Sequence, residues 1–330
     1  MSSIKKFEFL EVAGSHKDVG RAIGTKFGSI IRERITERQK RIVDYDKYLK
    51  NVEPYYNATK ERFPNLIIES EEVAKAAGVG VADYFSINSH EVATDFKHDH
   101  CTVAVSFGEK GATVGHNEDW EGASPDALYI LKATIKGTTF LGLQYKVATP
   151  GVAVTINNWG LVQCINYLDQ APQIGVPKNF VARAVLECKT LGEAEKVIRE
   201  TKRASGFNHV LVQGHKVWNI ETAADKIAVI RIDGDPYVHT NHYLVPEMKT
   251  LEKSHTESSI ARYKRAKEIV NSSMDETEME ELLSDTKNVK YPISRKDATL
   301  GSFIAQPSLK EVYICYGPPD KGKYQKYESA

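Results

Sequence analysis

The stretch Cys101–Trp120 reads CTVAVSFGEKGATVGHNEDW. A β-rich run at 102–107, a turn at 108–111 that contains two glycines, and a second β-rich run predict a hairpin. Because an antiparallel hairpin brings its end back beside its start, we expect Asp119 to lie near Cys101 although the two are far apart in sequence. A thiol at the head of a strand with a carboxylate beside it indicates a nucleophile and a group that orients it.

The composition indicates a globular protein with one large or two medium domains. The chain has 330 residues, of which 41% are apolar, and no run of eighteen apolar residues occurs that would predict a membrane span. Its N-terminus lacks the apolar core of a signal peptide. Basic and acidic residues number 44 each, so the net charge is zero. The composition therefore gives no excess of positive charge that would favour binding to nucleic acid or an anionic membrane. The four cysteines show no close pairing, which favours a reduced, cytoplasmic protein.

The first hundred residues have a helical pattern. Apolar side chains recur every three or four residues over 15–49, which predicts a long helix that Ser15 could cap. Similar patterns predict a second helix over 64–77, ended by Gly78, and a shorter one over 81–88. This part of the chain is therefore expected to be mostly helical.

After Cys101 the pattern changes to short β-rich runs separated by Gly, Pro or Asn, with helices grouped between them. This arrangement predicts sheets packed face to face with helices outside, and not alternating βαβ units. No dinucleotide, phosphate-loop or zinc-protease motif and no repeat is present. We expect strands at 128–135, 139–145, 152–156, 161–166, 209–212, 217–220, 227–232, 302–305 and 312–316, and helices at 179–188, 191–201, 258–272 and 275–284.

A catalytic cysteine needs a base or a lowered pKa. Cutting the chain immediately before Cys101 would supply a free α-amine, whose pKa of about 8 suits a base at neutral pH. On the residue pattern alone, a cysteine that opens a strand is also typical of a buried apolar side chain. Both interpretations are open at this point.

Several short motifs in a fixed order carry a resemblance to a known family. They are Cys101–Thr102 with Gly115–Trp120, Gly14–His16 with Gly20–Gly24, Asn157–Leu161, Gly175–Pro177, His239–His242, and Ser294–Arg295 with Ala298–Leu300. Together they resemble the isopenicillin-N acyltransferase family of autoproteolytic N-terminal-nucleophile enzymes, which is distantly similar to penicillin V acylase and bile-salt hydrolase. The resemblance covers nearly the whole chain, and the set of motifs is far more specific than any one of them.

The resemblance implies the fold and its division. It implies an α+β protein with the four-layer αββα sandwich of N-terminal-nucleophile hydrolases. Residues 1–100 would form a helical N-terminal pro-segment that stays associated after cleavage, and residues 101–330 would form the catalytic domain.

The resemblance also implies roles for individual residues. Cys101 would be the nucleophile both in cleavage of the His100–Cys101 bond and in acyl transfer. Asp119 would bind and orient the freed α-amine, and Asn241 would donate its side-chain amide to the oxyanion. Arg295 would lie near the nucleophile and position it or a substrate carboxylate. Apart from the resemblance, Asn241 has the pattern of a turn residue and Arg295 that of a solvated charge.

Other residues receive secondary roles. Backbone N–H groups near Asn166 and Tyr167 would supply a second oxyanion donor. His116, Asn117 and Trp120 are expected to line the site.

The chain departs from its relatives at two positions. The fungal enzymes and several relatives cut a Gly–Cys bond, whereas this chain has His100 before Cys101. Glycine relieves crowding at the attacked carbonyl, so self-cleavage here could be slower or absent, and His100 could instead serve as a proton donor. The resemblance also places His116 where penicillin V acylase-like relatives carry Arg. The substrates of those enzymes are therefore not transferred to this chain.

A rival hypothesis treats the histidines before Cys101 as a metal cluster. Asp95, His98, Asp99 and His100, together with His116, have the residue types and the His-x-His spacing of zinc ligands. The segment is also short and polar, as is typical of a solvated linker in which a processing site is accessible. A metal-dependent hydrolase is thus the first alternative, and an uncleaved binding protein on the same fold is the second.

The leading hypothesis is a thiol enzyme that attacks a small-molecule amide or thioester and forms a thioester on Cys101. Hydrolysis is favoured over transfer, because water is always available and no coenzyme A phosphate site is evident. We expect neither a cofactor nor a resident metal, and a homo-oligomer is compatible with the sequence. An apolar acyl group is suggested by aromatic side chains at Trp120, Tyr145, Trp159, Tyr167 and Phe180.

Overall fold

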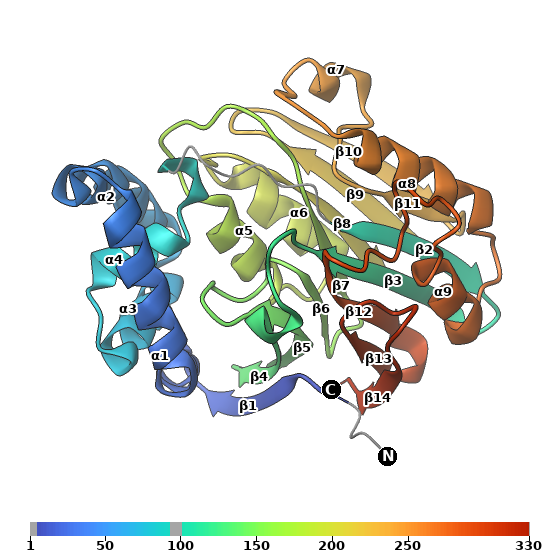
Figure 1. The fold of residues 1–330 in the computed structure, drawn as a ribbon, viewed down its shortest axis with the longest axis horizontal. Coiled ribbons are helices and arrows are strands. Elements are labelled where there is room, and N and C mark those ends of the chain that lie inside the picture. Colours follow the sequence, from blue (N-terminus) through green and yellow to red (C-terminus); the bar gives the residue numbers. More distant parts are fainter. Residues whose placement is uncertain (1–4, 93–100, 330) are drawn as a thin grey trace.

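Two β-sheets pack face to face, and helices cover the outer face of each (Figure 1). The computed structural model describes residues 5–92 and 101–329. Helices of the N-terminal region lie on one side of the molecule, and the helices near residues 257–283 lie on the other, with both sheets between them. The four-layer αββα arrangement and the α+β class that the sequence indicated are confirmed.

The larger sheet has eight strands in the order β1-β4-β5-β6-β7-β8-β9-β10. Neighbouring strands are antiparallel except β1 and β4, which pair in parallel. The strands are β1 (Glu8–Gly14), β4 (Leu128–Ile135), β5 (Thr138–Tyr145), β6 (Val154–Asn157), β7 (Val162–Tyr167), β8 (Phe207–Gln213), β9 (Lys216–Thr222) and β10 (Ile227–Asp233).

The smaller sheet has six antiparallel strands in the order β11-β2-β3-β12-β13-β14. The hairpin of β2 and β3 pairs Thr102 with Asn117, so Cys101 and Asp119 lie side by side at its open end, as the sequence predicted. The strands are β2 (Thr102–Gly108), β3 (Gly111–Asp119), β11 (Tyr237–His239), β12 (Thr299–Gln306), β13 (Glu311–Tyr316) and β14 (Tyr324–Glu328).

The central core lies between the sheets, where Val103 and Val105 of β2 meet apolar side chains of β5 and β8. The opposite face of the smaller sheet is also covered, since Ala104 and Ile304 pack against Met279 of the helix behind them. Because both faces are buried, β2 has a continuous apolar sequence and not an alternating one.

Helices α1 (His16–Arg41), α2 (Tyr45–Arg62), α3 (Pro64–Ala77), α4 (Val81–Ile87), α5 (Lys178–Val185) and α6 (Leu191–Glu200) pack with the larger sheet. Helices α8 (Glu257–Ile269) and α9 (Glu276–Leu283) pack on the smaller one. Short helical turns are α7 (Pro246–Lys249), η1 (His90–Val92), η2 (Pro125–Ala127) and η3 (Pro307–Leu309). Among the described residues, no helix is long and apolar enough to cross a membrane.

Helices α1 and α3 approach so closely that glycine is required at their contact. A Cβ atom on Gly20 would lie 2.2 Å from the carbonyl oxygen of Glu69, and one on Gly24 would lie 2.4 Å from that of Val73. Both distances are far inside van der Waals contact, so any larger residue would force the helices apart.

The described part of the first hundred residues is mostly helical, as the sequence predicted, but it also contains a strand. Strand β1 lies within these residues and pairs in parallel with β4. No local sequence pattern predicted this strand. The helix expected over 15–49 is two helices, because α1 ends at Arg41 and Asp44, with φ +59°, begins α2 by accepting a hydrogen bond from the Lys47 backbone. Strands β11 and β14 and helix α7 were also not predicted. The division of the chain at residue 100 stays a prediction.

A buried ion pair joins the first hundred residues to the rest. Glu69 of α3 accepts two hydrogen bonds from Arg183 of α5, at 2.9 and 2.7 Å, and Arg183 also donates to Glu187 at 2.9 Å. Glu69 and Arg183 are almost completely buried. A bidentate pair of this kind fixes the relative position of α3 and α5.

Removing one partner of this pair should destabilise the protein strongly. Glu69→Ala leaves Arg183 buried with only Glu187 opposite it, so we expect the free energy of unfolding to fall by about 3 kcal/mol. Urea denaturation measures this change. The matched control is Glu72→Ala, which removes the exposed pair with Arg21 and should cost less than about 1 kcal/mol. Equal losses in the two variants would contradict the structural role of the buried pair.

Candidate active site

Cys101 lies immediately before β2 in an unusual backbone conformation. Its φ is +75°, in the left-handed region that residues other than glycine rarely adopt, and its side chain is 3% exposed. Conformations of this kind store backbone strain and concentrate at functional sites. The strain here is located at the residue that the sequence identified as the nucleophile.

The Cys101 thiol faces a carboxylate that the sequence did not single out. The Sγ atom donates to Oε2 of Glu118 at 3.3 Å. The Tyr145 hydroxyl donates to the other oxygen of Glu118 at 2.5 Å, and His116 Nε2 lies 2.8 Å from Oε2. Since Tyr145 ends β5 and Glu118 belongs to β3, this cluster connects the two sheets beside the thiol.

This environment keeps the thiol protonated in the uncleaved chain. Burial raises the pKa of Cys101 well above its ordinary value, and the negative charges of Glu118 and Asp119 raise it further. A hydrogen bond from the Asp119 backbone acts in the opposite direction but does not outweigh them. With its pKa raised in this way, the thiol is a poor nucleophile at neutral pH.

Asp119 is fully buried beside Cys101 and has one oxygen without a hydrogen bond. Its Oδ1 accepts from the Thr299 hydroxyl at 2.6 Å, whereas Oδ2 accepts none among the described residues and lies 3.9 Å from Arg295 Nη1. Burial raises the pKa of Asp119, and the positive charges of Arg262 and Arg295 oppose this. A buried acceptor of this kind fits an ammonium group.

Arg262 of α8 links Cys101 and Thr102 to Asn241 through hydrogen bonds, although no sequence pattern identified it. The side chain is fully buried. Its Nη1 donates to the Cys101 carbonyl at 2.7 Å and to the Thr102 hydroxyl at 2.8 Å, and its Nη2 donates to Asn241 Oδ1 at 3.1 Å. In the sequence Arg262 is one of several basic residues of a charged helix, such as Arg265, so nothing local distinguishes it.

Asn241 lies in the loop after β11 with its amide orientation fixed. Because Oδ1 accepts a hydrogen bond from Arg262, the amide nitrogen points away from Arg262. It donates to the Tyr167 carbonyl at 3.3 Å. The Asn241 backbone N–H donates to the Ser259 hydroxyl at 2.8 Å. Asn241 therefore presents an N–H donor, the group that the expected oxyanion role requires.

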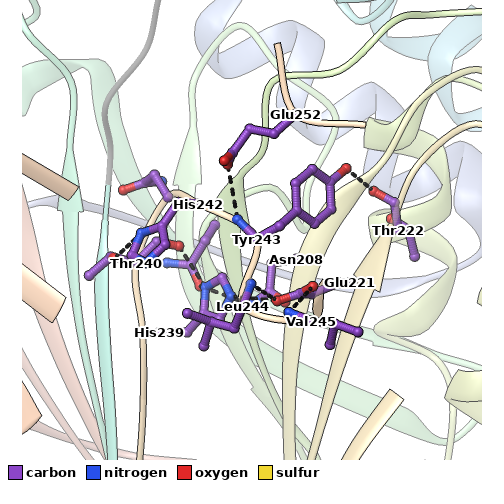
Figure 2. A network of polar contacts seen from close by, with 12 residues as sticks. Asn208, Glu221, Thr222, His239, Thr240, His242, Tyr243, Leu244, Val245 and Glu252 are labelled. Carbon is purple, nitrogen blue, oxygen red and sulfur yellow. Dashed lines mark hydrogen bonds and ion pairs between the residues drawn. The ribbon is translucent and has the colours of Figure 1, made fainter. Parts of the chain in front are cut away.

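A network of buried polar groups fixes the rest of this loop (Figure 2). Glu221 of β9 accepts from the backbone N–H groups of Leu244 and Val245, at 2.6 and 3.1 Å, as Figure 2 shows. Tyr243 donates its N–H to Glu252 at 3.0 Å and its hydroxyl to the Thr222 carbonyl at 2.9 Å. The loop that carries Asn241 is thus anchored to β9 of the larger sheet by the residues that follow Asn241.

Arg295 lies beside the carboxylate next to Cys101, whereas Asn117 differs in its placement from what the sequence indicated. Arg295 pairs with Glu121, and its Nη1 lies 3.9 Å from Asp119 Oδ2, while its expected role at the nucleophile stays a prediction. Asn117 donates its amide to the carbonyls of Leu283 and Ile293, at 2.9 and 3.1 Å. The side chain of Asn117 therefore holds the loop before Arg295 and does not line the cavity, because strand alternation points it away from the face of Glu118.

The other expected site residues are distributed around the same centre. Tyr167 and Trp120 line the cavity, and the Tyr167 carbonyl accepts from Asn241. Asn166 Oδ1 accepts from Asn208 at 3.2 Å. His116 is buried beneath Glu118.

A cavity opens at the Cys101 thiol. Glu118 and Asn179 belong to its wall, and two arginines of α1 lie in the same wall. Most of the surface is apolar or aromatic, formed by Ile87, Trp120, Tyr145, Val147, Ala148, Val152, Ile165, Tyr167 and Phe207. The apolar wall suits the apolar part of a small organic molecule.

The metal cluster of the rival hypothesis, Asp95, His98, Asp99 and His100, lies outside the described residues. Within the described residues, ligand atoms of Cys101, His116 and Glu118 lie within 4.8 Å of one another. Thiolate, imidazole and carboxylate are zinc ligands, so these three side chains could hold a metal ion at the position of the thiol.

Comparison with known proteins gave a family match and similarities to solved structures. The family described as acyl-coenzyme A:6-aminopenicillanic acid acyl-transferase matches residues 106–321. This span begins after Cys101 and contains Asp119, Asn241 and Arg295. No curated protein matched the chain. The crystal structure of a mutant of the conjugated bile acid hydrolase from Clostridium perfringens is similar with a TM-score of 0.44 and 11% sequence identity, covering 70% of this chain and 97% of that chain.

Removing the Glu118 charge should make the thiol more reactive. In Glu118→Gln the pKa of Cys101 should fall, since a negative charge beside the sulfur is lost. We expect the uncleaved species of this variant, separated by intact mass from any cleaved fragments, to be alkylated by iodoacetamide several-fold faster at pH 7.5 than the uncleaved wild type, and its rise with pH to begin at lower pH.

The control is Glu109→Gln, in the exposed turn of the same hairpin, which should leave the pH profile unchanged. Cys101→Ala gives the background from the other cysteines. An identical profile in wild type and Glu118→Gln would show that Glu118 does not control the thiol.

Proposed function

Since the chain belongs to the acyl-coenzyme A:6-aminopenicillanic acid acyl-transferase family, we propose that it is an N-terminal-nucleophile cysteine enzyme that cleaves a small-molecule amide or thioester. The family indicated by the sequence motifs is confirmed, and hydrolase or acyltransferase chemistry is its general class. The observation that carries the specific proposal is that one buried guanidinium binds both the backbone of Cys101 and the side chain of Asn241, next to an Asp119 oxygen that accepts no hydrogen bond from the described residues.

The first step is self-cleavage at Cys101. The thiol proton passes to Glu118, its hydrogen-bond acceptor at 3.3 Å, as Sγ adds to the carbonyl carbon of His100. The C–N bond then breaks, and the nitrogen takes the proton from Glu118. Water hydrolyses the resulting thioester, which restores the thiol and leaves a free α-amine on Cys101. The φ of +75° at Cys101 supports this step, because breaking the bond releases strain.

In the mature enzyme the α-amine replaces Glu118 as the base. Asp119 Oδ2 accepts a hydrogen bond from this amine and orients it. The amine takes the thiol proton as Sγ attacks the substrate carbonyl, and the Asn241 amide with a backbone N–H near residues 166–167 stabilises the oxyanion. The leaving amine or thiol takes the proton, and a thioester remains on Cys101.

Water then hydrolyses the acyl-enzyme, with the α-amine again as the base. We favour hydrolysis over transfer because water reaches the thioester in every turnover, whereas an amine acceptor would need a binding site of its own. The chemistry needs no cofactor.

Residues 1–100 remain bound after cleavage in this proposal. Strand β1 is an integral part of the larger sheet, α1 and α3 cover its outer face, and Glu69 pairs with Arg183 of α5. Separation would expose this core to water, which is strongly unfavourable.

A metal-dependent hydrolase is the second candidate, favoured by the proximity of Cys101, His116 and Glu118. The two candidates respond differently to chelation. Dialysis against a chelator should leave a cysteine nucleophile active, whereas it should abolish a zinc-dependent activity, and restoration by added zinc would identify the second mechanism.

Self-cleavage predicts two fragments in the purified protein. Denaturing intact-mass spectrometry of the wild type should show residues 1–100 and 101–330, while Cys101→Ala should be whole, because it lacks the attacking sulfur. An intact wild type would overturn the self-cleavage step. Fragments in Cys101→Ala would instead indicate an external protease.

The oxyanion role predicts a loss of turnover in Asn241→Ala. We expect kcat to fall about 100-fold against N-acyl p-nitroanilides, with a much smaller change in KM, since the donated hydrogen bond strengthens in the transition state. Asn65→Ala, on the exposed surface of α3, is the matched control. Retained kcat in Asn241→Ala would assign the donor to another group.

A further inference from the structure

A partly buried arginine that has no carboxylate partner among the described residues lies in the wall of the cavity. Arg38 of α1 donates through Nη1 to the Ser86 carbonyl at 2.9 Å, and its guanidinium lies 5.4 Å from the centre of the Tyr48 ring. These contacts fix the side chain in place. Within residues 5–92 and 101–329, no carboxylate lies at ion-pair distance from it.

A second arginine adds positive charge to the same wall. Arg34 lies one helical turn before Arg38, and both line the cavity that contains the Cys101 thiol. Arg34 is partly exposed and lies 3.4 Å from Glu37. Burial lowers the pKa of Arg38, and the charge of Arg34 lowers it further. A charge in such surroundings is costly unless an opposite charge joins it.

The carboxylate that lines the cavity does not provide a negative partner for Arg38. Among the residues that line it, Glu118 is the carboxylate, and its oxygens are occupied by Tyr145, His116 and the Cys101 thiol. The cavity therefore combines an apolar wall with a fixed cation whose charge is not neutralised by the described part of the protein.

We propose that this cavity binds a substrate with an apolar body and a carboxylate, and that Arg38 pairs with the carboxylate while Arg34 adds to the attraction. This inference rests on the proposed function in that Cys101 attacks a carbonyl of the same molecule. A planar guanidinium matches a carboxylate with two parallel hydrogen bonds. The apolar wall contributes by removing the body of the substrate from water.

The proposal gives residues 1–100 a direct part in substrate recognition. Arg34 and Arg38 belong to α1, and Ile87, which also lines the cavity, ends α4. The binding site is thus completed by the segment that precedes the nucleophile. Loss of that segment would remove the charge recognition together with part of the apolar wall.

Matched thiol reagents can test the cation without requiring any enzymatic activity. The probes are 6-maleimidohexanoic acid and its methyl ester, which carry the same thiol-reactive group and apolar chain but differ in charge. The ratio of their rates with Cys101 is measured by intact mass, with Cys101→Ala as background. We expect wild type to react about tenfold faster with the acid, which corresponds to about 1.4 kcal/mol.

Substitutions of Arg38 decide which residue produces the preference. Arg38→Met should bring the ratio close to one while the ester still reacts, which shows that the variant is folded. Arg38→Lys should restore most of the preference, since it keeps the charge. Lys40→Met, on the exposed side of α1, is the matched control and should behave as wild type.

The outcomes separate this inference from the proposed function. A wild-type ratio near one, or a ratio that survives in Arg38→Met, would overturn the anion site whatever reaction the protein catalyses. A charge preference that depends on Arg38, in a protein that cleaves no amide or thioester, would support the anion site and overturn the enzymatic proposal.

Discussion

One buried guanidinium, that of Arg262, connects the parts of the site that are far apart in the chain. It binds the carbonyl of Cys101, the hydroxyl of Thr102 and the side-chain oxygen of Asn241. A guanidinium has five donors in a rigid plane, so it can fix the start of β2 and the loop after β11 at the same time. Since the group is charged and completely buried, loss of one acceptor is costly, and the geometry around Cys101 is correspondingly rigid.

The carboxylates around Cys101 disfavour the thiolate, and in our proposal they act differently after cleavage before Cys101. In the uncleaved protein, burial and two carboxylates raise the pKa of the thiol, which keeps it neutral. A free α-amine at Cys101 would add a positive charge beside the Asp119 oxygen that accepts no hydrogen bond from the described residues. In our proposal the same carboxylates that restrain the thiol of the precursor then stabilise an ammonium in the mature enzyme, because a nearby opposite charge favours the ionised form.

The first hundred residues are part of the fold and not an appendage to it. They supply the edge strand β1, the helices that cover the larger sheet and part of the cavity wall. Close packing of α1 on α3, which requires Gly20 and Gly24, places Arg38 where it reaches the cavity. The stability of this region and its proposed role in recognition therefore depend on the same contacts.

The sequence by itself determined the elements whose signals are local. The strand–turn–strand pattern after Cys101 predicted the pairing that brings Asp119 beside it, and the run of strands and helices predicted the layers, because periodicity reports which faces are buried. Only the tertiary structure decided which distant side chains meet, such as Arg262 with Cys101 and Tyr145 with Glu118, and that β1 joins the sheet through β4. Such contacts leave no local pattern, because a charged residue that is buried in the fold has the same sequence signal as one that is exposed.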